Sequence, residues 1–92
     1  MLESEQQGGL PVKLNAVVST VDYGKIVITL DKVLQEKGIT KNKLATLTNL
    51  DYRVISRLHD DKDNVVTVDL DFLARICYVL NCSLSEIVQY EK

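Results

Sequence analysis

The chain has 92 residues, which is enough for one domain. Apolar residues make up 46% of it and aromatic residues only 5%, a composition typical of a compact helical core of Leu, Ile and Val. No apolar run approaches the roughly 18 residues that a membrane-spanning helix needs, so no membrane span is expected. The net charge of −2 argues mildly against nucleic acid as a partner, because phosphate contacts supply much of that affinity.

The amino terminus and the cysteines exclude several kinds of site. Residues 1–7 are acidic and polar, unlike a secretory signal, so we expect a cytoplasmic protein. The spacing of Cys77 and Cys82 fits neither a zinc knuckle nor a redox pair, and His59 is the only histidine. We therefore expect no metal and no cofactor, and Cys77 is expected to pack as a small hydrophobic residue.

The same residue types argue against an enzyme. The chain has one histidine, no glycine-rich loop for a phosphate and little volume for a closed site. Cys82 as nucleophile with His59 as base is conceivable on paper, but the helical motif described below is the stronger pattern. We expect no catalytic residue.

Three regions follow one another along the chain. Residues 1–11 have no apolar periodicity and are expected to be a flexible N-terminus. Over 12–29, apolar and polar residues alternate, which predicts a β-rich arm or hairpin. Residues 30–92 are predicted to form a helical domain.

Two pairings are open for the end of this arm. Gly24 follows Asp22 and Tyr23 in a turn-forming sequence and can take a positive φ, which favours a hairpin within the arm. In the alternative, residues 26–28 pair with residues 88–90 and bring the two ends of the chain together.

Capping residues and apolar spacing predict five helices, over about 30–37, 41–48, 52–59, 70–80 and 83–88. Gly38 ends the first helix and Asn81 ends the fourth. Ser83 and Glu86 form a capping box that starts the fifth. The fourth helix is expected to be buried through Leu70, Leu73, Ala74, Cys77 and Leu80.

The second and third predicted helices flank a tight turn. Thr40 is a good N-cap for the first of them, and Leu44 and Ala45 give it a small inward face. Asn49 can take the left-handed conformation that ends a helix, and Leu50 is expected to point into the core.

Asp51 then caps the next helix, whose exposed side is polar. Ile55 and Leu58 lie one turn apart and are expected to face inward. The side chains left facing outward are Tyr52, Arg53, Ser56 and Arg57. A braced helix with Arg, Tyr and Ser on its free side is suited to a DNA major groove.

This arrangement resembles the helix-turn-helix of the Cro and lambda-repressor type, a family of small transcription regulators. The similarity covers about two thirds of the chain, in segments 39–45, 48–50, 54–58, 70–77 and 80–87. It implies an all-α fold, a five-helix lambda-repressor-like DNA-binding domain, here with a short β-rich N-terminal arm or hairpin. Asn49 stands where the family usually has Gly, and Asp60-Asp61 where it often has Asn-Gly.

The resemblance also implies a set of DNA-binding residues. The helix over 52–59 would enter the major groove while the preceding helix braces it. Arg53 is the best candidate for base readout, because its planar fork matches O6 and N7 of guanine. The start of the preceding helix, with its positive dipole, favours a phosphate. The complete set is Lys41, Asn42, Lys43, Asp51, Tyr52, Arg53, Val54, Ser56, Arg57 and Lys62.

Several of these residues have a competing structural role. Arg57 can instead pair with Asp60 or Asp61, and Tyr52 can pack on the bracing helix. Arg53 can be an ordinary solvated side chain. The acidic residues after the helix either face solvent or repel phosphate and so suppress nonspecific binding.

The charge distribution favours DNA more than the total does. Residues 38–62 carry a balance of +2, whereas residues 63–92 carry −3. The protein is predicted to be a sequence-specific DNA-binding transcriptional regulator that acts as a repressor. Its expected partner is double-stranded DNA. The alternative is a protein-interaction module, such as an antitoxin or antirepressor, with a protein partner.

One such domain covers few base pairs, so a homodimer that meets two half-sites is expected. The arm at 12–29 is one candidate for the dimer surface, because an exposed strand edge invites pairing. The fifth helix with the Tyr90 tail is the other.

Overall fold

The computed structural model describes residues 12, 14 and 21–92. Within 21–92, five α-helices, one 3₁₀ helix and two strands follow one another. In chain order these are β2 (Lys25–Ile28), α1 (Leu30–Lys37), α2 (Lys41–Thr48), α3 (Tyr52–Asp60), η2 (Lys62–Asn64), α4 (Leu70–Leu80), α5 (Leu84–Ile87) and β3 (Val88–Glu91). The predicted all-α, five-helix fold is confirmed, with a small two-stranded antiparallel sheet beside the helices.

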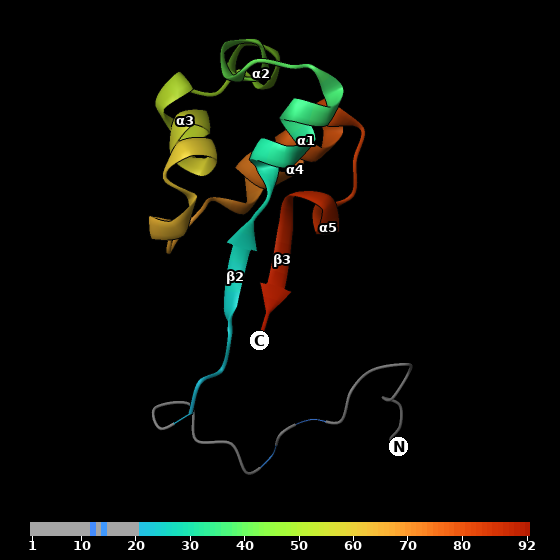
Figure 1. Cartoon of the computed structure of the whole chain (residues 1–92). Coiled ribbons are helices and arrows are strands. Elements are labelled where there is room, and N and C mark those ends of the chain that lie inside the picture. The colour runs from blue at the N-terminus through green and yellow to red at the C-terminus, as the bar shows by residue number, and fades with distance from the viewer. Residues whose placement is uncertain (1–11, 13, 15–20) are drawn as a thin grey trace.

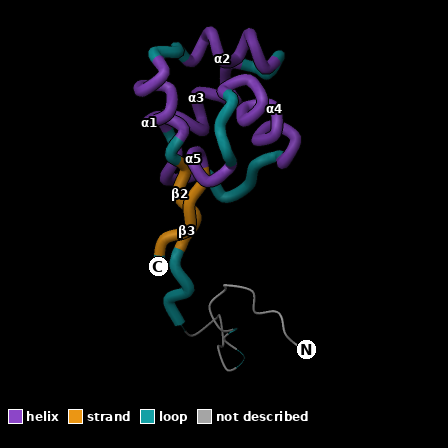
Figure 2. Tube along the Cα trace, turned by 90° about the vertical axis from the view of Figure 1, so that its right-hand side faces the viewer, coloured by secondary structure: helices purple, strands orange, loops and turns teal. Residues whose placement is uncertain are grey.

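The helices gather at one end of a two-stranded ribbon that projects from them (Figures 1 and 2). β2 pairs antiparallel with β3, and Ile28 lies opposite Val88 while Ile26 lies opposite Tyr90. The pairing of the two ends of the domain, one of the two predictions, is confirmed. The hairpin within 12–29 falls largely on residues outside the described part of the chain.

Gly24 fixes the point where the chain enters the ribbon. It has φ of 84°, and its N–H donates to Asp22 Oδ1 at 3.0 Å. A Cβ at this position would collide with the carbonyl oxygen of Glu91 and the ring of Tyr90. The hydroxyl of Tyr90 donates to the carbonyl of Tyr23 at 2.6 Å. Only glycine allows this close approach of the two chain segments.

Local capping explains where the helices begin and end. Thr40 Oγ1 accepts from Lys43 N–H at 3.1 Å at the start of α2. Asp69 Oδ1 accepts from the Asp71 N–H at 2.9 Å at the start of α4. The helices α1, α2 and α4 each end at a left-handed residue, namely Gly38, Asn49 and Asn81. These caps satisfy backbone groups that would otherwise be left without partners.

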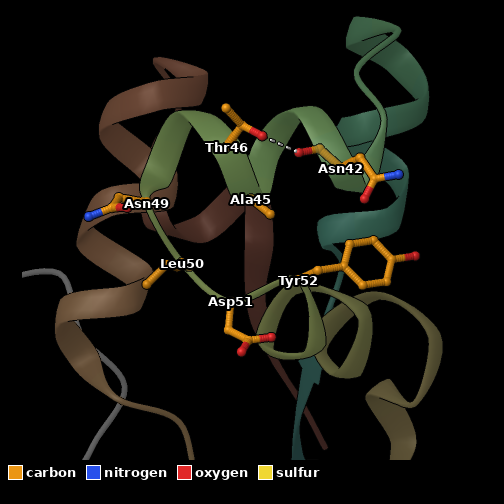
Figure 3. A pocket seen from close by; sticks show the side chains of 7 residues that line it. All are labelled: Asn42, Ala45, Thr46, Asn49, Leu50, Asp51 and Tyr52. Carbon is orange, nitrogen blue, oxygen red and sulfur yellow. Dashed lines mark hydrogen bonds between the residues drawn. The ribbon is translucent and has the colours of Figure 1, made fainter.

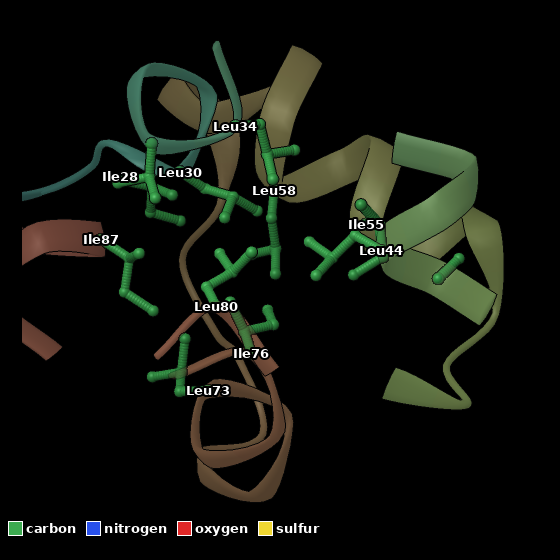
Figure 4. Packing of buried hydrophobic residues seen from close by; sticks show 12 residues of the cluster. Ile28, Leu30, Leu34, Leu44, Ile55, Leu58, Leu73, Ile76, Leu80 and Ile87 are labelled. Atoms are coloured by element: carbon green, nitrogen blue, oxygen red, sulfur yellow. The ribbon is translucent and has the colours of Figure 1, made fainter. Parts of the chain in front are cut away.

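The core lies where all five helices meet. Its side chains come from every helix and from the end of β2 (Figure 4). The buried residues are Ile28, Leu30, Val33, Leu34, Leu44, Ala45, Ile55, Leu58, Leu73, Ile76, Leu80 and Ile87. Each fully buried Leu or Ile contributes about 1.5–3 kcal/mol relative to exposure. The aliphatic core that the composition predicts is therefore present.

The predicted buried face of α4 is wrong in part. Leu70 is 79% exposed and Ala74 is also exposed, whereas Ile76 is fully buried. The buried line runs through Leu73, Ile76 and Leu80 because α4 packs against both α2 and α5. Leu70 lies in the first turn, before the helix reaches the core.

Cys77 is half-buried and packs against the core, as expected for a small hydrophobic residue. Val88, predicted to close α5, instead begins β3. No helix within the described residues has the length and apolarity to cross a membrane.

The revised face of α4 gives a direct test. Ile76→Ala should lower the free energy of unfolding by about 2–5 kcal/mol, because it leaves a cavity in the core. Leu70→Ala should change it by no more than about 0.5 kcal/mol, since the side chain is exposed. Urea unfolding of both variants measures the difference. Equal losses would show that Leu70 faces the core after all.

Candidate nucleic-acid interface

The turn between α2 and α3 is held rigidly. Asn49 has φ of 57° and ψ of 40°, which explains why Asn replaces Gly here without distorting the turn. Leu50 N–H donates to the carbonyl of Ala45 at 3.1 Å, and the Leu50 side chain packs against the core. Arg75 of α4 donates to the carbonyls of Thr48 and Asn49 at 3.2 and 3.3 Å. Sequence reasoning missed Arg75, because its contact joins residues on different helices.

The next helix, α3, buries one side and exposes the other. Ile55 is fully buried and Leu58 is 1% exposed, so the helix is anchored in the core. Tyr52, Arg53 and Arg57 are exposed, as predicted. Val54 and Ser56 are only half-buried, and Val54 packs against the core. A polar helical surface is thus held outward on a buried aliphatic base.

At the start of α3, Arg53 is paired with the capping residue. Its Nε donates to Asp51 Oδ1 at 3.2 Å and its Nη2 donates to Oδ2 at 2.9 Å. Asp51 Oδ1 also accepts from the Arg53 N–H at 2.8 Å, which caps the helix. These bonds to the Arg53 side chain and backbone lower the pKa of Asp51 to about 2. Arg53 is therefore exposed but not unpaired.

A second carboxylate joins the start of α2 to the end of α3. Asp60 Oδ2 accepts from Lys41 Nζ at 2.5 Å and from Ser56 Oγ at 2.9 Å. Its Oδ1 lies 2.6 Å from His59 Nδ1. These bonds, above all the one from Lys41, hold the pKa of Asp60 well below its usual range. The Lys41 ammonium also lies 5.7 Å from the centroid of the Tyr52 ring.

Two of the predicted DNA-binding residues, Arg57 and Lys62, are hydrogen-bonded to groups outside α2 and α3. Arg57 Nη2 donates to the carbonyl of Thr67 at 3.3 Å, so it pairs with neither Asp60 nor Asp61. Lys62 Nζ donates to Asp31 Oδ2 on α1 at 2.8 Å. That hydrogen bond lowers the pKa of Asp31.

Three of the predicted residues, Asn42, Asp51 and Tyr52, line a shallow hollow between α2 and α3. Figure 3 shows Asn42 and Tyr52 near one end of it and Asn49, Leu50 and Asp51 near the other. Its volume is about 690 Å³, and Thr46 donates to the Asn42 carbonyl at 3.1 Å beside it. Lys43 is exposed on the same helix, α2. The hollow brings together polar groups from both motif helices.

Among residues 12, 14 and 21–92, no three His, Cys, Asp or Glu side chains lie together in a group that could hold an ion. The thiol pKa of Cys82 is raised, first by burial and then by its neighbour Cys77.

Comparison with known protein families agrees with this geometry. No curated protein matches the chain. The profile of the Cro/C1-type HTH DNA-binding domain matches residues 29–92, which contain all five helices and β3. The protein belongs to the family of Cro/C1-type helix-turn-helix DNA-binding domains.

Proposed function

We propose that the protein is a sequence-specific transcriptional regulator whose helix α3 enters the DNA major groove. The observation that carries this proposal is the exposed polar start of α3 on a base formed by the buried Ile55 and Leu58. A helix that is fixed in this way can present side chains to base edges without being reordered. Repression is the expected mode, because occupation of a promoter by the bound domain is enough to block it. A cytoplasmic location fits this role.

The proposed roles differ along α3. Arg53 reads guanine, because its guanidinium fits the O6 and N7 acceptors. Tyr52 donates to a phosphate or packs on a thymine methyl, and Val54 has only the second option. Ser56 sits one turn further along, where its hydroxyl, which donates to Asp60, accepts from a base edge. Arg57 is assigned a secondary role, because its guanidinium already binds the Thr67 carbonyl.

Phosphate contacts are assigned mainly to α2. Asn42 and Lys43 lie in its first turn, where the helix dipole favours an anion. Lys41 lies beside them, but a phosphate has to compete there with the Asp60 carboxylate. Lys62 is the weakest candidate, since it already pairs with Asp31. Release of counterions from these contacts supplies the sequence-independent part of the affinity.

Selection of bound duplexes from a random pool tests this proposal. We expect one preferred half-site, and Arg53→Ala should lose about 1–3 kcal/mol of discrimination at one guanine. Lys92→Ala is the matched control, because it removes one positive charge at the far end of β3. Uniform weakening of all sequences by Arg53→Ala would make Arg53 a phosphate contact instead.

A protein-interaction module is the second candidate function. Leu47 and Tyr78 are 48% and 88% exposed beside an apolar hollow of about 320 Å³ between α2 and α4. Together with the acidic net charge, this surface is what favours an antitoxin or antirepressor that binds a protein. Salt separates the two functions. Binding through several phosphates weakens steeply as salt is added, whereas binding through an apolar groove does not.

We also infer that two copies act together, through the outer edge of β2. Thr29 N–H donates to the Ile87 carbonyl at 2.8 Å, next to the pair of Ile28 with Val88. Because hydrogen-bonded pairs alternate in an antiparallel ribbon, the backbone groups of Ile28 and Ile26 point away from β3. Within the described part of the chain, no hydrogen bond from outside the ribbon reaches them, although η2 lies close to β2.

The side chains at this edge support the same surface. Ile26 and Tyr90 face each other across the ribbon, and each is 62% exposed. Two β2 edges that pair antiparallel about a two-fold axis would bring Ile26 beside the β2 strand of the second copy. To read two half-sites in successive major grooves, such a dimer has to present its two α3 helices about 34–36 Å apart.

The dimer surface is tested by sedimentation of two charged variants. Ile26→Lys should reduce the sedimenting mass from two copies to one, because it places a charge in the proposed interface. Leu84→Lys on α5, where Leu84 is 53% exposed, should leave the dimer intact. If Leu84→Lys is monomeric and Ile26→Lys remains a dimer, the interface lies on α5. If both variants remain dimers, neither surface is the interface.

A further inference from the structure

The carboxylate of Asp51 makes more contacts than a helix cap requires. Capping needs only the bond from the Arg53 N–H to Oδ1. The same carboxylate also holds Nε and Nη2 of the Arg53 side chain, one on each oxygen. A Ser or Asn would cap the helix equally well, but neither offers two charged acceptors to a guanidinium.

This pairing fixes which part of Arg53 remains available. A guanidinium has five N–H donors in one plane. Asp51 takes the Nε donor and one Nη2 donor. The two donors that remain parallel lie at the Nη1–Nη2 end, directed away from the carboxylate. A fork of this kind matches the O6 and N7 acceptors of guanine.

The pair contributes little to the stability of the free protein. The Arg53 and Asp51 side chains are 89% and 51% exposed, and exposed ion pairs are weak in water. Its value therefore lies in orientation. Arg53 has several freely rotating bonds, and a side chain that is already held in the binding geometry loses less freedom when it binds.

The charge of Asp51 also affects which DNA is tolerated. A carboxylate repels phosphate and cannot donate to the O6, N7 or O4 acceptors of the bases. It is accommodated at the interface only while Arg53 lies between it and those acceptors. A base that Arg53 cannot contact leaves the carboxylate against an acceptor, which penalises the wrong sequence.

We infer that Asp51 is a positioning residue that holds Arg53 with its Nη1–Nη2 end toward a guanine and thereby sets sequence preference. This inference rests on the proposed DNA-reading function of α3. It assigns to Asp51 a role in specificity in addition to its role as the N-cap of α3.

The test compares three full-length variants with the unaltered protein. Asp51→Ser keeps the helix cap and removes the ion pair with Arg53, whereas Asp51→Glu keeps a carboxylate within reach of Arg53. Arg53→Ala removes the guanidinium that is proposed to contact guanine. Each is titrated, at one fixed salt concentration, with the selected duplex and with the duplex whose recognised G·C pair is replaced. Unfolding midpoints show whether each variant is folded.

We expect the unaltered protein to prefer the selected duplex by roughly 5- to 150-fold at that position. Asp51→Ser should lose most of this preference, as Arg53→Ala does, and should bind a random duplex more tightly. Asp51→Glu should recover much of the preference, even where its unfolding midpoint is lower, because Glu is a poorer cap.

Three results would overturn the inference, and they differ from one another. If Asp51→Ser keeps its guanine preference and only its unfolding midpoint falls, Asp51 is a helix cap alone. Tighter binding to all duplexes with unchanged preference would mean that Asp51 only masks the charge of Arg53. If the unaltered protein selects no sequence from a random pool, the proposed function itself fails.

Discussion

Burial of the inner side of α3 is the constraint on which the other features depend. Ile55 is fully buried and Leu58 nearly so, and both pack in the aliphatic core with Leu44 of α2. The loss of either would release the helix that carries the exposed polar surface. The turn before it is fixed from three sides, by the left-handed Asn49, by Leu50 against the core and by Arg75 from α4. The orientation of α3 is therefore a property of the whole domain.

The polar surface held by this base is largely paired within itself. Asp51 holds Arg53, and Asp60 holds Lys41 together with Ser56. A protein of net charge −2 thus has three cations at the candidate interface that lie beside a carboxylate, namely Lys41, Arg53 and Lys62. DNA has to replace or share these pairs, so phosphates alone gain less than they would from free lysines and arginines. Such a surface favours a sequence that offers good base contacts over one that offers only a backbone.

Much of the fold was predictable because local chemistry decided it. Thr40 and Asp51 cap their helices, and Gly38 and Asn49 end theirs in the left-handed conformation, as expected. The buried face of α4 was not predictable in the same way. Leu70 is apolar and correctly spaced, but the contacts of α4 with α2 and α5 turn the helix toward Ile76. Apolar spacing defines a stripe, and only the neighbouring helices decide which part of it is covered.

By itself, the sequence determined the helix-turn-helix, its caps and the exposed start of α3, because these follow from residues within one turn of each other. The tertiary structure decided which charges are free. Lys41 meets Asp60, and Lys62 meets Asp31, across 19 and 31 residues of sequence. It also decided that β2 pairs with β3, so that Ile26 lies opposite Tyr90. Contacts of this kind depend on how distant segments are packed, and side-chain spacing along one helix carries no information about them.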